Sequence, residues 1–442
     1  MKKRNTRHEK RLKRLIVTCL LCAIILTVST YAWFIGMQTV SVDAFEINIA
    51  SVDSLQLSLD GKTFSDKLTI NPDVLRVLKS GVEEGDDEDD YSYIKTYTTG
   101  NTNSWEALEP MSSVGTVDYT SSKMVLFEKG SLTASTGGYR IMAEPVANTT
   151  NEVKGYVAFD LFVKNLSGEA YYNEVTDPSN EEAIYLDYGS KVESGESGTT
   201  TTGIENSIRV AFAPIGRVKV TEANQTNGLA QQITCEKDAT SGKPKYNAET
   251  GITGICRPAT IWEPNDTDHV DAAITWFTKS CKNRTDKDTW GTACTPIVDG
   301  TAYPTYAISD TITETNEVDV YDGLNTYFGN IVMNGDAPET DATKKAAEKL
   351  LAVDTFTDTE KTQGDSSVNP GQTGADRIEF MTLAPNSITK VRVYVYLEGQ
   401  DVDNYDFASL GSKVTVNFGF TKERFTQADV GAANAEYPEE SN

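Results

Sequence analysis

The chain has 442 residues, enough for one large or two ordinary hydrophobic cores, and its 20 Tyr and 15 Phe argue against global disorder. The formal net charge is −25; residues 1–32 carry eight Lys or Arg and one Glu, so the rest of the chain carries −32. Such an acidic surface excludes nucleic acid as a partner, because phosphate contacts need clustered basic side chains.

The N-terminal residues carry an export signal. A basic flank, which stays on the cytoplasmic side, is followed by an uncharged apolar run. Small residues at the usual cleavage spacing predict that residues 1–32 are a signal peptide cut between Ala32 and Trp33. The alternative is an anchor in the cytoplasmic membrane, because residues 15–37 are long enough to span a bilayer. In both cases we expect the remaining chain to be secreted or otherwise extracellular.

A strand is predicted directly after this segment. From residue 39 apolar side chains recur at every second position, which is the period of a half-buried strand. The buried phase changes at Ala44 and Phe45, so we expect a bulge or bend there. The residues expected to face the interior, of this sheet or of a neighbour's, are Val40, Val42, Phe45, Ile47 and Ile49.

Further along, residues 155–164 carry apolar side chains on both faces, which predicts a central strand covered on both sides. The clearest alternation lies in residues 390–397 and 414–420. Short helices are predicted over residues 71–79 and 341–351. We therefore expect a mainly β protein, an antiparallel jelly-roll-like β-sandwich with a disulfide-stapled insertion and one or two short helices.

The composition changes after about residue 216 toward Thr, Asn, Asp and Lys. Because strong strands occur toward both ends of the chain, we expect one β-sandwich formed by residues 33–220 and 311–425. The cysteine-containing insertion is expected at residues 221–310, and a flexible tail at residues 426–442. Two β domains in series are the alternative.

Four cysteines follow the apolar N-terminal run: Cys235, Cys256, Cys281 and Cys294. An even number in an exported chain favours two disulfides, whereas a zinc site is disfavoured because no Cys-x-x-Cys pair occurs among them. Pairing of near neighbours, Cys235 with Cys256 and Cys281 with Cys294, is the first choice among three connectivities.

No catalytic or cofactor motif occurs in the sequence. The chain has two histidines, and phosphate-binding glycine loops and histidine-based zinc motifs are absent. We therefore expect no enzyme and no cofactor, and we expect His269 to be a surface residue in an acidic loop.

Asp401, Asp403 and Asp406 are spaced like the opening of a calcium loop, but the expected glycine and closing glutamate are missing. A solvated loop is therefore favoured over a metal site.

Residues 30–34 (Thr-Tyr-Ala-Trp-Phe) resemble the cleavage region of the TasA/camelysin family of secreted bacterial matrix proteins, and residues 45–49 occupy the place of the strand that follows there. The resemblance implies a jelly-roll sandwich that forms extracellular fibres in which the N-terminal strand of one subunit completes the next. Residues 35–37 depart from the family's Asp-containing run, and the chain is larger than typical members. Three further segments are similar to recurring features of cell-surface proteins of Gram-positive bacteria: residues 206–212, 261–266 and 391–401.

Two functions follow as alternatives. The first is a self-associating structural protein of the cell surface or extracellular matrix, as in a biofilm, in which residues 38–49 add to a neighbour's sheet edge. The second is a membrane-tethered adhesin or glycan- or protein-binding module that recognises a surface ligand through its long loops and the tryptophans of the insertion. Those tryptophans are Trp262, Trp276 and Trp290.

Overall fold

The protein is described here by a computed structural model. It describes residues 40–49, 55–70, 76–78, 91–93, 108–128, 131–135, 138–142, 145–146, 155–166, 169–175, 178–195, 202–282, 297–303, 305–308, 350–362, 378–405 and 413–422. The predicted mainly β fold is confirmed, since two large sheets dominate and the helices are few and short. Within these ranges no helix is long and apolar enough to cross a bilayer, and the predicted export segment lies outside them.

The smaller of the two sheets has six strands, and it joins the N-terminal and C-terminal ends of the fold. β1 pairs parallel with β24 and antiparallel with β3. The register of β1 on β24 shifts between Val42 and Ala44, which confirms the predicted bulge. The strands are β1 (Ser41–Ile49), β3 (Lys67–Ile70), β13 (Glu182–Leu186), β14 (Lys191–Ser194), β22 (Met381–Leu383) and β24 (Lys413–Lys422).

The larger sheet has ten strands and is centred on three long ones, β12, β23 and β15, which lie side by side. The register of β15 on β23 shifts between Pro214 and Gly216, so this strand also bends. The strands are β2 (Leu55–Ser58), β6 (Pro110–Ser112), β9 (Phe127–Glu128), β12 (Val157–Asn165), β15 (Ile208–Lys219), β16 (Tyr246–Asn247), β17 (Ile252–Gly254), β18 (Thr260–Glu263), β21 (Phe356–Thr357) and β23 (Ser387–Glu398).

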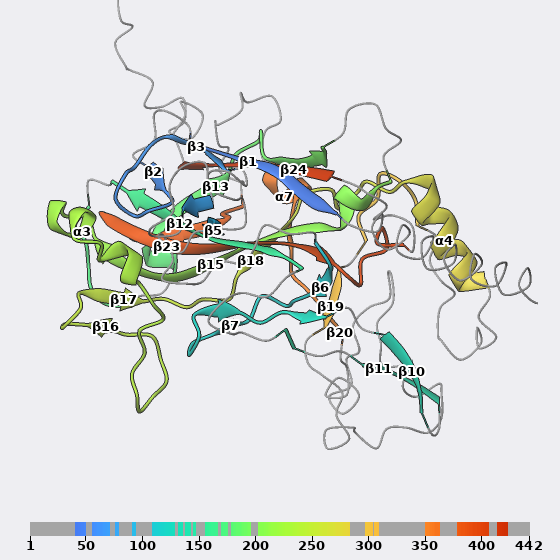
Figure 1. Cartoon of the computed structure of the whole chain (residues 1–442), viewed down its shortest axis with the longest axis horizontal. Helices are drawn as coiled ribbons and strands as arrows, with labels where there is room; N and C mark the ends of the chain where they lie inside the picture. Colours follow the sequence, from blue (N-terminus) through green and yellow to red (C-terminus); the bar gives the residue numbers. More distant parts are fainter. Residues whose placement is uncertain are drawn as a thin grey trace, which may run out of the picture.

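The main hydrophobic core lies between the two sheets (Figure 1). Phe212 of β15 is fully buried there, and its ring centroid lies 4.9 Å from that of Phe380 and 5.0 Å from that of Phe418. Alternate apolar residues of β12 belong to this core: Val157, Phe159, Leu161 and Val163. Their alternation therefore reflects burial against the six-stranded sheet.

The other face of the ten-stranded sheet is covered by an outer layer, which we define as residues 113–126, 229–245 and 255–259. Tyr156 and Phe162 of β12 are buried beneath it, so the predicted covering of this strand on both faces is confirmed. Tyr394 is buried on the same face and accepts a hydrogen bond from the Met124 backbone N–H at 2.9 Å. Figure 1 shows β7, β16 and β17 on the opposite side of β15 and β23 from β1 and β24.

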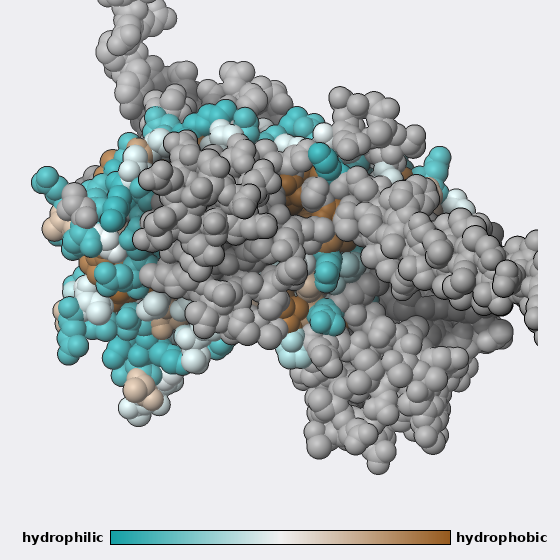
Figure 2. All heavy atoms as spheres, in the orientation of Figure 1, coloured by the Kyte–Doolittle hydropathy of each residue, from teal (hydrophilic) through white to brown (hydrophobic). Residues whose placement is uncertain are grey.

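Shorter elements complete the described part of the chain. Hydrophilic residues predominate around α3, β16 and β17 in Figure 2. The paired strands are β4 (Arg76–Leu78) with β5 (Tyr91–Tyr93), β7 (Val117–Asp118) with β8 (Lys123–Met124), β10 (Ser131–Ser135) with β11 (Gly138–Met142), and β19 (Tyr306–Ile308) with β20 (Leu350–Ala352). The α-helices are α3 (Glu222–Thr226), α4 (Asp271–Lys282) and α7 (Asp358–Thr362), and the 3₁₀ turns are η2 (Pro178–Asn180), η3 (Ile204–Ser207) and η4 (Ala230–Gln232).

The structure corrects three details of the sequence prediction. Residues 76–78 form β4, not part of a helix, because pairing with β5 overrides local propensity. Residues 350–352 likewise form β20, while the rest of the second predicted helix lies outside the described residues. The sheets are mixed, since the pairs β1–β24, β18–β21 and β6–β23 run parallel.

The segment expected as an insertion contributes to the sandwich itself. β17 and β18 both pair with β15, and β16 extends the sheet beyond β17. Trp262 of β18 is fully buried in the main core. β16, β17 and β18 therefore belong to the ten-stranded sheet, although local composition sets them apart.

Candidate functional site

The predicted assembly strand is an internal strand of its own sheet. β1 lies between β24 and β3, and its register on β24 runs from Ser41 opposite Lys413 to Ile49 opposite Phe420. Phe45 lies within the same register. Within one chain, β24 thus pairs along the whole of β1, and β3 pairs with residues 45–48 on its other edge.

Three of the predicted interior residues of this strand are buried. Val40 and Ile47 are fully buried, and Val42 is 2% exposed. The Leu108 backbone N–H donates to the Val40 carbonyl at 2.6 Å, so the strand is also attached just ahead of its bulge. Withdrawal of β1 would therefore open a slot along β24 and expose part of the main core.

A second candidate site is a cavity of about 390 Å³ between the outer layer and the ten-stranded sheet. β23 forms its floor, the turn between β7 and β8 forms one wall, and residues 233–237 form another. Cys235 lines the cavity and is disulfide-bonded to Cys256, with Cα atoms 5.5 Å apart. This bond is the first of the two predicted pairings, and it holds the outer layer together beside the cavity.

Two buried cations form the floor. Lys390 and Arg392 are 3% and 1% exposed, and both face Asp160 of β12. Arg392 Nε donates to Asp160 Oδ1 at 2.7 Å, and Lys390 Nζ lies 3.0 Å from Asp160 Oδ2. Burial raises the pKa of Asp160, but the two cations outweigh burial and leave it lowered, whereas burial lowers the pKa of Lys390. The Asp160 carboxylate thus bridges the two buried cations.

The wall between β7 and β8 is a tightly bonded turn. The Asp118 carboxylate accepts from the backbone N–H groups of Thr120 at 2.9 Å and Ser121 at 3.1 Å. Ser122 has φ of +57°, in the left-handed region that a non-glycine residue adopts only at a cost. Its Oγ accepts from the Cys235 backbone N–H at 2.9 Å, so the turn is joined to the disulfide-bonded segment at residues 233–237.

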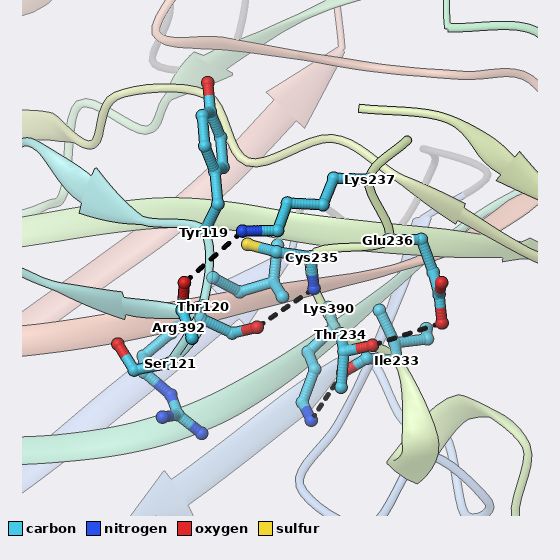
Figure 3. Close-up of a pocket in the computed structure, with 12 residues that line it drawn as sticks. Tyr119, Thr120, Ser121, Ile233, Thr234, Cys235, Glu236, Lys237, Lys390 and Arg392 are labelled. Atoms are coloured by element: carbon cyan, nitrogen blue, oxygen red, sulfur yellow. Dashed lines mark hydrogen bonds between the residues drawn. The ribbon is translucent and has the colours of Figure 1, made fainter. Parts of the chain in front are cut away.

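The rim of the cavity combines an aromatic ring with a cation. Tyr119 is 39% exposed, and Figure 3 shows its ring on the opposite side of the lining from the head groups of Lys390 and Arg392. Lys237 Nζ donates to Thr120 Oγ1 at 3.3 Å. The rim is therefore amphipathic, with an apolar face beside hydroxyl and ammonium groups.

The residues of the weak calcium candidate have other partners. Asp401 accepts from Arg209, and Asp403 Oδ2 lies 2.8 Å from His269 Nδ1. Asp406 lies outside the described residues. Within the described ranges, no group of three His, Cys, Asp or Glu side chains is arranged to hold a metal ion. The two described carboxylates thus serve ion pairs inside the protein.

The expectation that His269 lies on the surface is wrong. The residue is only 7% exposed, because residues 297–303 and the loop after β23 pack around it. Its Nε2 lies 3.1 Å from the Thr301 carbonyl. Burial opposes the charged ring, but Asp403 outweighs this effect and raises the pKa of His269, while burial raises the pKa of Asp403 to about 6.

A further buried ionic cluster connects β15, β18 and the end of β23. Arg209 is fully buried and donates to Glu263 and Asp401. Glu263 also accepts from the Thr305 hydroxyl. Burial raises the pKa of the neighbouring Glu398 to about 8. The cluster joins distant parts of the chain, and its enclosure gives it a structural role.

Several predicted site residues are not brought together. Trp262 is buried and donates to Asp358, whereas Trp276 of α4 is 41% exposed. The cleavage residues Ala32 and Trp33 lie outside the described residues, as do Trp290 and Cys294. Cys281 lies in α4, and its side chain is outside the description as well.

Sequence reasoning missed the cavity because its residues are far apart in the chain. The turn at residues 119–122 and the segment at residues 233–237 meet the same strand, β23, from different places in the sequence. The alternation of Lys390 and Arg392 with buried valines was visible, but alternation alone does not show that an outer layer covers the polar face.

No family model matches this chain, and no curated protein or solved structure matches it.

Proposed function

We propose that this protein is an exported structural protein of a bacterial cell surface or extracellular matrix, and that it assembles by exchanging β1 between copies. The observation that carries the proposal is the position of β1. It is the first strand of the described fold, yet it is inserted between β24 and β3, which come later in the sequence. A terminal strand can leave such a slot without threading the rest of the chain through it.

Exchange would conserve the contacts of the strand. The main-chain hydrogen bonds to β24 and β3 and the packing of Val42 and Ile47 are the same whether β1 comes from the same chain or from another copy. Repeated exchange from one copy to the next gives a linear assembly. The N-terminal resemblance to the TasA/camelysin family supports this reading.

The disulfide supports an oxidising location. Cys235 and Cys256 are both buried, and disulfides persist mainly in secreted and extracellular proteins. The acidic composition outside the basic N-terminal flank suits a soluble surface component. Export followed by assembly outside the cytoplasmic membrane is consistent with both features.

A cross-linking experiment tests strand exchange. Glu46 of β1 lies opposite Thr69 of β3, so the double variant Glu46→Cys/Thr69→Cys places two thiols on paired strands. The matched control, Glu193→Cys/Thr415→Cys, joins β14 to β24 on the side of β24 away from β1. Both proteins are oxidised under assembly conditions, separated on non-reducing gels, and examined by electron microscopy.

Exchange predicts a ladder of covalent oligomers for the Glu46→Cys/Thr69→Cys protein and monomers for the control, because only β1 would come from another chain. Filaments together with monomers for both variants would show assembly by another route. Monodisperse particles without filaments would refute the assembly function itself.

A further inference from the structure

We propose that Lys422 and Asn165 form an intramolecular amide bond that joins the two sheets of the sandwich, with Glu182 as the proton carrier. The lysine is the last residue of β24 and the asparagine is the last residue of β12, so the bond ties the six-stranded sheet to the ten-stranded sheet. The inference does not depend on strand exchange, because none of the three residues belongs to β1.

The three side chains take positions where the strand pattern calls for apolar residues. Every second residue of β24 ahead of Lys422 belongs to the main core, and Asn165 continues the corresponding series on β12. Glu182 stands in phase with the two core residues of β13. Because alternate side chains of a strand share a face, all three polar groups lie on the sides of their sheets that face the main core.

One oxygen of Glu182 holds both reacting nitrogens. Lys422 Nζ lies 2.6 Å from Glu182 Oε2, and Asn165 Nδ2 donates to the same oxygen at 2.9 Å. The lysine nitrogen is therefore no more than two hydrogen bonds away from the asparagine amide. The flexible stem of a lysine lets Nζ move toward Cγ of Asn165 while the carboxylate stays in contact with both partners.

The amide of Asn165 is fully buried and held in one orientation. Its Nδ2 also donates to the Ala384 carbonyl at 3.0 Å, and because both partners are acceptors, the amide nitrogen is the atom that faces them. Among the described residues, none donates a hydrogen bond to Asn165 Oδ1. A buried carbonyl without a donor costs free energy, so this amide is less stabilised than an amide in water.

The reaction exchanges one amide for another. Glu182 takes a proton from the Lys422 ammonium group, and the neutral Nζ attacks Asn165 Cγ. The carboxyl passes that proton to Nδ2, the Cγ–Nδ2 bond breaks with its electron pair on nitrogen, and ammonia leaves. Glu182 then accepts the second proton that Nζ loses and releases it to solvent. The new bond joins Nζ to Cγ, and no oxidant, reductant or further reactant is consumed.

The surroundings favour this proton transfer. Lys422 lies opposite Ile184 and Glu182 lies opposite Leu383, and both apolar residues are buried. Burial disfavours a charged pair relative to a neutral amine and a neutral acid. The side chains of Lys422 and Glu182 keep 17% and 28% of their exposure, so ammonia can escape to solvent and the reaction runs in one direction.

Lys390 is also buried beside a carboxylate, but it lacks this arrangement. Burial raises the pKa of Asp160, yet Arg392 and Lys390 outweigh burial and leave that pKa lowered, so the carboxylate stays ionised. An amine does not attack an ionised carboxylate, whereas the carbonyl carbon of an amide accepts it. The chemistry therefore selects the site at Asn165.

Intact-mass spectrometry of the full-length protein tests the proposal. The protein is purified in its folded form, reduced and denatured, and its mass is compared with that of its sequence from the measured N-terminus. We expect a mass lower by one ammonia molecule, and a protease digest that contains a branched peptide joining the segment around Asn165 to the segment around Lys422. The reduced wild type should also migrate faster on a denaturing gel than an unlinked chain, because the bond closes a large loop.

Two variants assign the roles of the residues. Lys422→Arg keeps the charge and should restore the full mass and remove the branched peptide. Glu182→Gln keeps an acceptor for Asn165 and should slow bond formation about a hundredfold or more, because glutamine cannot carry the proton. Lys413→Arg, at the other end of β24, is the matched control and should form the bond like the wild type.

The wild-type mass decides even where a variant fails to fold. A folded wild-type protein with its full mass and without a branched peptide would overturn the proposal. So would a loss of ammonia that persists in Lys422→Arg, since asparagine can also lose ammonia by cyclising onto its own backbone. Bond formation by Glu182→Gln at the wild-type rate would overturn it as well. These outcomes are read from mass alone and leave the test of strand exchange separate.

Discussion

Replacement of Glu398 by glutamine should change how stability depends on pH. Glu398 ends β23, is 1% exposed, and accepts a hydrogen bond from the Gln400 backbone N–H at 3.0 Å. Burial raises the pKa of this carboxyl to about 8, so it carries a proton near neutral pH. Glutamine has nearly the same shape and is neutral at every pH, so Glu398→Gln imitates the protonated residue.

The magnitude follows from proton linkage. The folded-state pKa of about 8 exceeds the ordinary value of 4.5, so between these values the folded protein binds more protons than the unfolded chain. Stability from Glu398 is therefore full at low pH and is lost as the pH rises through about 8. At about 1.4 kcal/mol per pH unit, the loss between about pH 5 and about pH 9 is on the order of 4 kcal/mol.

Urea unfolding of both proteins near pH 5, 7 and 9 measures the effect, with tryptophan fluorescence, to which buried Trp262 contributes, as the signal. The free energy of unfolding of Glu398→Gln, relative to the wild type, should increase steadily from pH 5 to pH 9. Glu249→Gln, at an exposed glutamate, serves as the control and should follow the wild type at each pH. Parallel pH profiles for Glu398→Gln and the wild type would refute the assignment of a neutral buried carboxyl at this position.

Three further changes test the packing that forms the sandwich and its outer layer. Asp160→Ala removes the carboxylate that bridges two buried cations and should lower the free energy of unfolding by about 3–5 kcal/mol in urea titrations. Cys235→Ser combined with Cys256→Ser releases a link across a sequence separation of 21 residues and should cost roughly 3 kcal/mol, measured against the oxidised wild type. Phe212→Ala removes a fully buried ring from the main core and should cost about 3–5 kcal/mol, with Tyr119→Ala unchanged as the exposed control.

The long strands were predictable because each has a regular period and a long run of apolar residues. Residues 155–164 read as a central strand, and β12 is indeed covered on both faces. The phase change near Ala44 also identified a real bulge, because one extra residue reverses the faces of a strand. Short elements were less predictable, as β4 shows, because pairing with a distant strand outweighs a weak local preference.

The candidate sites were predictable to different degrees. The strand at residues 40–49 could be identified from its alternation, but its parallel partner β24 could not, since the two segments are separated by most of the chain. His269 and Asp403 also gave no signal, because the sequence around each reads as an acidic loop. Their contact depends on two loops that pack together from different parts of the fold.

By itself, the sequence determined that this is a mainly β protein with a basic apolar N-terminal segment, because composition and periodicity are local properties. Tertiary structure alone decided that β1 completes a slot between β24 and β3. It also decided that an outer layer encloses the cations of β23 and leaves a cavity above them. Both features depend on contacts between residues far apart in the chain, and no local pattern encodes which distant segment will cover which face.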